Sequence, residues 1–265
     1  MSTIFSNCII HIFYILSTRL LFIKDYTMLY THFLILLFKF LSIIMALSDK
    51  EILRHMGIGN ILIDPFRNDN LSTSSYDVSL GEFYFREQKP GDEMRIYNIY
   101  SKKHTERVWG TKPYQAKKAK DVLREDELEG MSDSDKIILI GPGETILAHT
   151  EEFIGGQNTI TTMMKARSSM GRSFIEVCKC AGWGDVGYTN RWTMEITNNS
   201  NHYIIPLVVG RRIAQIIFFD VGGILKNDYR KDGKYHDNPD FTKTKKEWRP
   251  QMMLPRLHKD RDIKK

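Results

Sequence analysis

Cysteine is scarce in this sequence: the chain of 265 residues contains three, at positions 8, 178 and 180. Cys178 and Cys180 lie too close together along one strand-like run to form an ordinary disulfide. This excludes the small secreted proteins that disulfides hold together. It indicates a reducing compartment, which we take to be the cytoplasm.

Long amphipathic helical periods are also missing, as are the glycine patterns of P-loops and of dinucleotide-binding turns. The sequence therefore argues against a helical bundle and against those two kinds of nucleotide-binding fold. Short apolar runs separated by turn residues are present instead, and the chain has 18 glycines. This pattern predicts a mainly β protein, a sandwich or jelly roll with a few short helices.

Residues 1–44 differ from the rest of the chain. They contain two apolar runs, Ile4–Leu16 and Leu29–Ile44, and the second approaches the length that spans a bilayer. Lys39 near its middle would be costly in lipid, and no small-residue cleavage site follows. We expect Met45 to be the natural start, with the leader as upstream sequence or a disordered extension. A membrane is a partner only if the leader is retained.

The excess of positive charge lies in the C-terminal tail. The formal net charge is +6, and residues 226–265 carry thirteen Lys and Arg against seven Asp and Glu, a difference of six. Such a tail is either a solvated surface or a site for an anionic partner, with nucleic acid and a polyphosphate as the alternatives. Between leader and tail we place one β domain, residues 45–225, interrupted by a charged excursion over residues 86–136.

Local patterns predict several elements. Ser48, followed three residues later by Glu51, predicts a capped helix over Asp49–Met56. A short helix is expected around Ala116–Leu123 in the excursion. Further on, a turn of the sequence Gly-Pro-Gly separates two strand-like runs and predicts a hairpin. The two runs are Lys136–Ile140 and Glu144–Thr150.

A zinc deaminase is one alternative for the chemistry, because His149-Thr150-Glu151 matches the H-x-E half of that motif. The other half requires P-C-x-x-C, whereas this chain has Cys178-Lys179-Cys180 with no proline before it. H-x-E also requires a helix where the sequence predicts a strand. We therefore predict no zinc, and we expect the two cysteines to be buried structural thiols on one strand face.

The turn from Arg167 to Arg172, with the sequence R-S-S-M-G-R, combines hydroxyls, guanidiniums and a glycine that permits close backbone approach. Charge-assisted hydrogen bonds from such a turn suit phosphate oxygens. Two acids follow, Asp185 and Glu195, and Glu195 falls on the polar face of an alternating strand. The apolar face of that strand carries Trp192, Met194 and Ile196.

Together these residues resemble the dCTP deaminase branch of the dUTPase-like superfamily. The motifs are R-S-S-x-x-R at 167–172, A-G-x-x-D at 181–185, the strand glutamate Glu195, and R-I-A-Q at 212–215. The likeness extends from about Met45 to Asn238, apart from the charged excursion. Further segments that carry it are Met45–Asp49, Ser75–Gly81, Pro142–Glu144 and Thr150–Glu152.

The resemblance implies a mainly β fold, a distorted β-barrel or jelly roll of the dUTPase-like type, assembled as a homotrimer with active sites between subunits. It implies Mg²⁺ carried by the nucleotide triphosphate, with no metal held by the protein. The nucleotides implied are dCTP and dUTP, with dTTP a further candidate, and no nucleic acid is expected. The reaction implied first is zinc-independent deamination of dCTP to dUTP and ammonia, feeding thymidylate synthesis.

The resemblance also implies roles for individual residues. Ser168 and Arg172 match the catalytic serine and arginine, Glu195 matches the proton-shuttling glutamate, and Ala181 supplies a backbone carbonyl that holds water and reads the base. Asp185 is expected to contact the deoxyribose 3′-hydroxyl, and Lys234 to bind phosphate from a segment that closes over the nucleotide. Further residues expected to bind substrate are Arg167, Ser169, Tyr188, Gln215, Tyr235 and Asn238.

The chain departs from the family pattern at Gly182–Tyr188. The expected proline is absent, Tyr188 replaces a tryptophan, and Trp183 occupies a position near the expected base pocket. A-G-x-x-D is also similar to dUTPases, in which the aspartate activates water for attack on the α-phosphate. A dUTPase, a bifunctional enzyme taking dCTP to dUMP, and a nucleotide-sensing or nucleic-acid-binding protein stay open. The sequence leaves two alternatives open for the far tail, Trp248–Pro255: packing on a neighbouring subunit, and disorder.

Overall fold

The structure is a computed structural model that describes residues 46–265 except 92–93, 226–227, 236–239, 261 and 263–265. The apolar leader and the expected start at Met45 lie outside the described residues. Among the helices of the described ranges, none combines the length and the apolar character needed to cross a bilayer.

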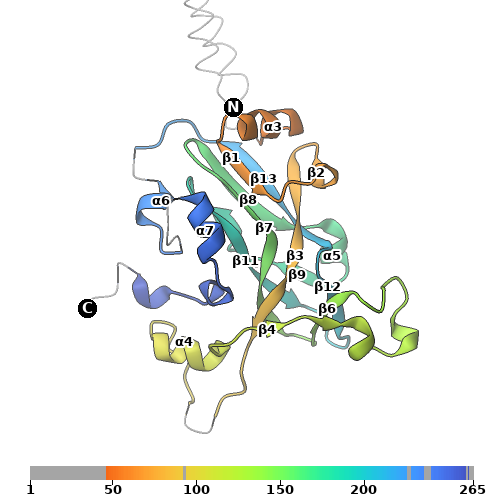
Figure 1. Ribbon diagram of the computed structural model, residues 1–265. Helices are drawn as coiled ribbons and strands as arrows, with labels where there is room; N and C mark the ends of the chain where they lie inside the picture. The colour runs from red at the N-terminus through yellow and green to blue at the C-terminus, as the bar shows by residue number, and fades with distance from the viewer. Residues whose placement is uncertain (1–45, 92–93, 226–227, 236–239, 261, 263–265) are drawn as a thin grey trace, which may run out of the picture. The chain divides into compact units, whose positions relative to one another are not determined.

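Two antiparallel sheets form the domain, which confirms the mainly β prediction (Figure 1). The larger sheet has ten strands; seven follow the order β10-β8-β13-β3-β7-β11-β9, β1 pairs with β7, and β2 and β4 pair with β3. Its strands are β1 Ile61–Asp64, β2 Leu71–Ser72, β3 Ser75–Arg86, β4 Tyr114–Gln115, β7 Thr145–Gly156, β8 Ile160–Ala166, β9 Ile175–Val177, β10 Trp183–Gly184, β11 Thr189–Asn198 and β13 Arg212–Asp220. The smaller sheet contains β12 Ile205–Val208, β6 Lys136–Ile140 and β5 Lys117–Lys118, in that order.

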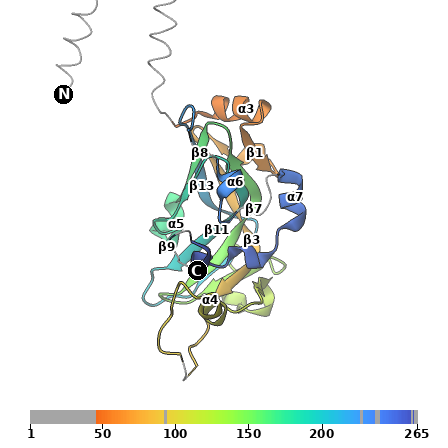
Figure 2. The same ribbon diagram turned by 90° about the vertical axis from the view of Figure 1, so that its left-hand side faces the viewer.

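Short helices lie around the strands. The first, α3 (Asp49–Gly57), begins where the sequence predicts, because the Ser48 hydroxyl accepts a hydrogen bond from the Glu51 amide at 3.3 Å. The others are α4 Lys102–Trp109, α5 Ser168–Arg172, α6 Tyr229–Asp232 and α7 Phe241–Glu247, with 3₁₀ turns at Asn68–Asn70, Ala119–Asp121, Glu125–Glu127, Pro250–Met253 and Leu257–Lys259. In both views α5 and α7 lie on opposite sides of the strands (Figures 1 and 2).

The helix of the charged excursion does not lie where the sequence suggested. The region Ala116–Leu123 contains a strand segment and one 3₁₀ turn, whereas the α-helix is α4. The hydroxyl of Ser101 caps α4 by accepting from the His104 amide at 3.3 Å, and Lys102 pairs with Glu106 one turn later at 3.4 Å. These local signals decide the position of the helix.

The predicted hairpin between β6 and β7 is also wrong. The two strands follow one another in the sequence but belong to different sheets, since β6 pairs with β12 and β5 while β7 pairs with β1, β3 and β11. At the Gly-Pro-Gly turn the chain bonds to Asn198 instead: Gly143 donates to its carbonyl at 2.9 Å and its amide donates to Glu144 at 3.0 Å. The turn therefore moves the chain from one sheet to the other.

The strand β3 changes partner at Gly81. Its first half pairs with β13 and its second half with β7, and the register shifts between Leu80 and Tyr84. The imidazole of His149 fills the space beside this bend, because a Cβ on Gly81 would lie 2.0 Å from its Cε1 atom. His149 is buried, with Nδ1 2.8 Å from the Thr150 carbonyl and Nε2 accepting from the Phe83 amide at 3.3 Å. The bend that curls the sheet is thus built around a neutral histidine.

Burial of His149 makes the stability of the fold depend on pH. Burial lowers the pKa of this imidazole from 6.5 to about 4, and the Thr150 carbonyl opposes the shift. Below pH 6.5, His149 is therefore protonated in the unfolded chain while it stays neutral in the folded chain. As a result, the free energy of unfolding falls as the pH decreases from 6.5 to 4. The difference corresponds to roughly 3 kcal/mol. Urea unfolding between pH 7 and pH 4 should show this loss in the native chain and not in His149→Gln. Parallel curves for the two proteins would refute the assignment.

The core and the face of β11 agree with the alternation in the sequence. Trp192, Met194 and Ile196 are buried on one side of this strand, and Glu195 points to the other. The cysteine prediction is half wrong: Cys178 is buried, whereas Cys180 is exposed. The cause is a turn after β9, in which Cys178 and Lys179 have positive φ, so the two thiols do not share a strand face.

Candidate active site

Glu195 opens into a cavity of about 410 Å³ on the polar side of β11. The volume is in the range of small-molecule sites in proteins. Its lining residues come from β11, from the segment around β10, and from the C-terminal tail. They are Leu147, Ala181, Trp183, Gly184, Asp185, Tyr188, Asn190, Arg191, Trp192, Thr193, Glu195, Tyr229, Tyr235, Trp248, Met252, Met253 and Pro255.

The carboxyl group of Glu195 has an environment that suits proton transfer. It is half-buried on the middle of β11, where Leu147 of β7 is its register partner. Burial raises the pKa of the Glu195 carboxyl above its usual value, and the nearby Lys179 ammonium opposes the shift. A carboxylate that holds its proton more readily than usual can both take a proton from water and return it.

Four other predicted residues lie in the same cavity: Ala181, Asp185, Tyr188 and, from the tail, Tyr235. Ala181 follows the turn after β9, Asp185 follows β10, and Tyr188 precedes β11. The cavity is therefore lined by residues of Gly182–Tyr188, the segment in which this chain departs from the family pattern. Tyr188 packs edge-on against the rings of Trp192 and Tyr229, at 5.2 and 5.3 Å between centroids, and burial raises its pKa. Trp183 also lines the cavity, as its expected position near the base pocket implied.

The tail forms one wall of this cavity within the same chain. Tyr235, Trp248, Met252, Met253 and Pro255 all line it. Met253 is buried with Phe85 and Leu147, and the Gln251 side chain donates to the Thr111 carbonyl at 3.3 Å. Of the two alternatives for Trp248–Pro255, disorder is therefore wrong, since the segment packs on its own chain. Only the apolar character of this short segment could have indicated its role.

Arg191 is a residue of the cavity that sequence reasoning did not single out. Its guanidinium lies between two rings, with Cζ 4.9 Å from the Phe153 centroid and 4.7 Å from that of Trp248. The Trp248 ring also lies 4.7 Å from the His149 ring, and Lys245 of α7 pairs with Asp64 at 2.6 Å. These contacts fix the tail against β7 and β11. The signal in the sequence was that Arg191 shares the polar face of the strand with Glu195.

The serine turn, Arg167–Arg172, does not contribute to the Glu195 cavity in the single chain. Ser168, Ser169 and Arg172 are exposed on α5, and none of them is among the described residues that line the Glu195 cavity. Arg167 lines a different cavity of about 550 Å³, together with Arg67, Arg211 and Arg212. The structure thus separates the predicted residues into two groups, one around Glu195 and one at α5.

A buried aspartate organises the α5 group. The carboxylate of Asp77 pairs with Arg167 and with Arg212, both at 3.2 Å, although Asp77 itself is buried on β3. Burial raises the pKa of Asp77, and the two guanidiniums oppose the shift. Gln215 on β13 is the register partner of Asp77, so this predicted residue belongs to the α5 group and does not line the Glu195 cavity.

One predicted residue of the tail, Lys234, does not line the Glu195 cavity in this structure. Lys234, expected to bind phosphate, pairs with Asp260 at 2.7 Å, and its ammonium lies 5.8 Å from the ring of Tyr235. Binding a nucleotide through Lys234 would require that pair to open. Asn238 lies outside the described residues.

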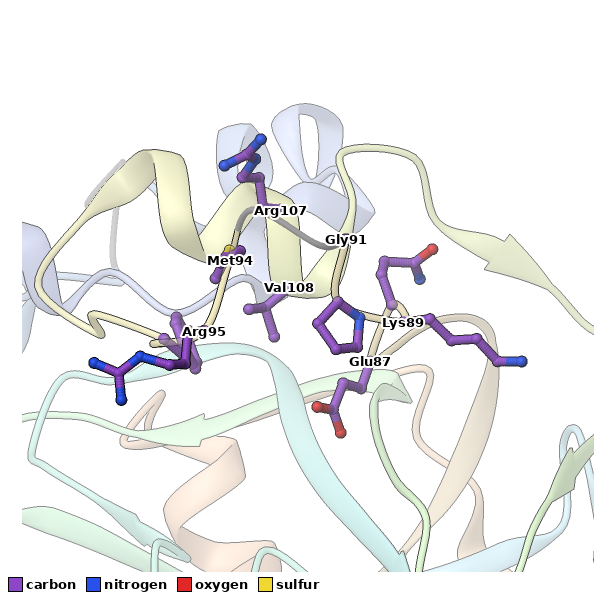
Figure 3. Close-up of a pocket in the computed structure, with 10 residues that line it drawn as sticks. Glu87, Lys89, Gly91, Met94, Arg95, Arg107 and Val108 are labelled. Atoms are coloured by element: carbon purple, nitrogen blue, oxygen red, sulfur yellow. The ribbon is translucent and has the colours of Figure 1, made fainter.

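A cavity of about 790 Å³, larger than the one at Glu195, lies in the charged excursion. Figure 3 shows that the charged ends of Lys89, Arg95 and Arg107 point away from one another rather than into a common space. A binding site for a charged ligand needs groups that converge. Size alone therefore does not favour this cavity over the one at Glu195.

Metal-ligating side chains do not gather in the part of the chain that the structure describes: no group of three or more His, Cys, Asp or Glu is placed to hold an ion. His149 of the H-x-E triplet is packed beside Gly81. The Cys178 thiol lies 3.1 Å from the Met164 sulfur, and burial raises its pKa.

Comparison with known proteins gives a consistent set of relatives. A family model described as dCTP deaminase-like matches residues 46–221. A protein of Hydrogenobaculum sp. (strain Y04AAS1) named "dCTP deaminase, dUMP-forming" is 34% identical over 179 residues, which cover 66% of this chain and 81% of the relative. A protein of Methanosphaera stadtmanae with the same name is 30% identical over 213 residues, covering 76% and 95%. The crystal structure of 2′-deoxycytidine 5′-triphosphate deaminase from Agrobacterium tumefaciens aligns with a TM-score of 0.45 and 19% identity, over 69% of this chain and 50% of that one.

Proposed function

The chain belongs to the dCTP deaminase-like family of enzymes, and on that basis we propose that it hydrolyses dCTP to dUMP, ammonia and pyrophosphate. The sequence motifs alone favoured dUTP as the product. The relatives named above carry the words "dUMP-forming", which favours the bifunctional alternative. The A-G-x-x-D segment, with its likeness to dUTPases, supports the same choice.

The observation that carries the proposal is the placement of Glu195 with Asp185 in one cavity. These two residues are the carboxylates among the described residues that line it. Two hydrolytic steps, one at carbon and one at phosphorus, each need a water molecule and a group that orients it or takes its proton. One cavity with two acids of different environment suits such a pair of steps.

The deamination step follows from the properties of Glu195. Its carboxylate removes a proton from water while the oxygen attacks C4 of cytosine, and the acid then delivers that proton to N3. The hydroxyl proton of the tetrahedral intermediate then passes through the same carboxyl to the amino group. The C4–N bond breaks, ammonia departs, and a carbonyl forms at C4. The raised pKa of Glu195 makes the return of protons easier, and the Ala181 carbonyl is proposed to hold the water.

The second step breaks the bond between the α- and β-phosphates. A second water attacks the α-phosphorus, pyrophosphate leaves, and dUMP remains. We assign the orientation of this water to Asp185, which is exposed at the cavity and lies at the aspartate position of A-G-x-x-D. Mg²⁺ is proposed to enter with the triphosphate and to neutralise charge on the leaving pyrophosphate.

The separation of Glu195 from α5 supports an active site shared between subunits of a homotrimer. Ser168 and Arg172 are exposed in the single chain, and so are three large apolar side chains: Phe174, which follows α5, by 54%, and Tyr203 and Ile204, before β12, by 68% and 61%. A neighbouring copy would cover these apolar side chains, and the α5 of one copy would meet the Glu195 cavity of another.

An assay of both products tests the proposal. The protein is incubated with Mg²⁺ and either dCTP or dUTP, and ammonia and pyrophosphate are measured separately. We expect equal amounts of ammonia and pyrophosphate from dCTP. Ammonia with accumulating dUTP would mean that the chain stops after deamination, and pyrophosphate from dUTP without ammonia from dCTP would mean a dUTPase. If neither ammonia nor pyrophosphate forms, the alternative that remains is a nucleotide-sensing protein.

A further inference from the structure

Arg191 has no acidic partner in the described part of the chain, although it is half-buried. No carboxylate lies within 4.0 Å of it there, and its Nε atom is buried without a hydrogen-bond acceptor. The four arginines of the α5 cavity differ, because each has a carboxylate at 2.9–3.2 Å. Those pairs are Arg67 with Glu151, Arg167 and Arg212 with Asp77, and Arg211 with Asp135.

Stacking leaves the hydrogen-bonding edge of this guanidinium free. Phe153 and Trp248 contact this guanidinium through their rings, with Cζ over both, and rings do not take up its N–H donors as a carboxylate would. A planar fork with unused donors is the geometry that binds phosphate or carboxylate oxygens at two points. Burial lowers the pKa of Arg191, and the carboxylates of Glu151, Glu152 and Glu82, none of them paired with it, oppose the shift.

The charges of the lining residues indicate which side chain could bind the phosphates of a nucleotide in this cavity. Glu195 and Asp185 line it as acids, and Arg191 is the one cation among its described lining residues. A nucleotide carries several negative charges, so it would meet two carboxylates in this cavity with no compensation other than Arg191. Along β11, Arg191 stands roughly 13 Å from Glu195, a separation comparable to that between a nucleotide base and its outer phosphates.

We propose that Arg191 is a phosphate ligand of the bound nucleotide, supplied by the same chain as Glu195. Phe153 and Trp248 hold its guanidinium in the plane that the phosphate requires. This inference rests on the proposed function and adds to it. It makes phosphate binding a task shared between Arg191 in the cavity and the serine turn, and it gives the docked tail a part in substrate affinity, because Trp248 supplies one of the two rings.

Binding measurements on three ligands test the role of Arg191. The ligands are deoxycytidine, dCMP and dCTP with Mg²⁺, titrated calorimetrically into the full chain in the E195Q background, which prevents turnover. Arg191→Gln is expected to weaken binding of dCTP by about 10- to 100-fold, the range for a charge-assisted hydrogen bond, and to leave deoxycytidine unchanged. Arg191→Lys keeps the charge without the planar fork and should recover part of the loss.

Lys245→Gln is the matched control. It removes a cation that docks the tail on Asp64 but does not line the cavity. If Arg191 only clamps the tail, both variants weaken deoxycytidine and dCTP alike and expose the tail to proteolysis, and the inference is overturned. Equal binding of dCTP with and without Arg191 overturns it while the proposed function stands. No binding of dCTP by the parent protein overturns the proposed function and this inference with it.

Discussion

Glu195→Gln lowers the kcat for release of ammonia from dCTP by roughly 10²- to 10⁴-fold, the contribution typical of a general base or acid. Glutamine has the size of glutamate and can still form hydrogen bonds, but it cannot take a proton from water. Binding of dCTP, measured by calorimetry, should change by less than about threefold, since the amide removes no phosphate contact. Retained turnover in this variant would remove Glu195 from the proposed mechanism.

Glu176→Gln is the matched control for Glu195→Gln. Glu176 lies on β9, next to β11, but does not line the cavity, and its replacement should leave turnover unchanged. The pH profile gives a second measurement. Because burial raises the pKa of Glu195, its carboxylate is lost as the pH falls through that raised value. The acidic limb of kcat/KM should therefore lie above the ordinary glutamate pKa, and it should be absent from the residual activity of the variant.

Mixing two inactive variants restores activity if the site is shared between subunits. Glu195→Gln removes the proposed base from the cavity, and Arg172→Ala removes a guanidinium of α5, which should cost roughly 10²-fold or more in kcat. Co-expressed in equal amounts, the two chains assemble at random, and a site is complete when one chain supplies Glu195 and its neighbour supplies Arg172. About one quarter of the sites should then be active.

A second mixture controls for unspecific recovery. Chains carrying Glu195→Gln and chains carrying Glu195→Ala both lack the proposed base in the cavity, so they cannot complete each other's sites. We expect that mixture to stay as inactive as its parents. If the mixture of Glu195→Gln with Arg172→Ala behaves in the same way, the active site is not shared and the proposed trimeric arrangement is wrong.

Local signals in the sequence predicted the elements that carry them. The alternation of β11 placed Glu195 on the polar side, and the hydroxyl of Ser48 marked the start of α3, because side-chain periodicity and capping act over a few residues. The hairpin between β6 and β7 failed, because pairing depends on contacts with strands far away in the sequence. The helix of the excursion was misplaced because a polar segment offers no apolar period to read.

The sequence could likewise predict some features of the candidate site but not others. Motif spacing indicated Ala181, Asp185, Tyr188 and Glu195, which the structure brings to one cavity. It could not indicate that the Ser168 turn opens away from that cavity in the single chain. Nor could it show that Arg191 is stacked between Phe153 and Trp248, since this contact joins residues 38 and 57 positions away from Arg191.

The tail wall also sets an order of events during synthesis. The strands that carry Glu195 and its neighbours leave the ribosome before Trp248, Met252 and Met253 are translated, and domains fold progressively from the N-terminus. A nascent chain can therefore form its sheet while the Glu195 cavity still lacks a side. The site becomes enclosed only after Trp248 has reached Arg191, so residues that are translated later complete the environment of Glu195.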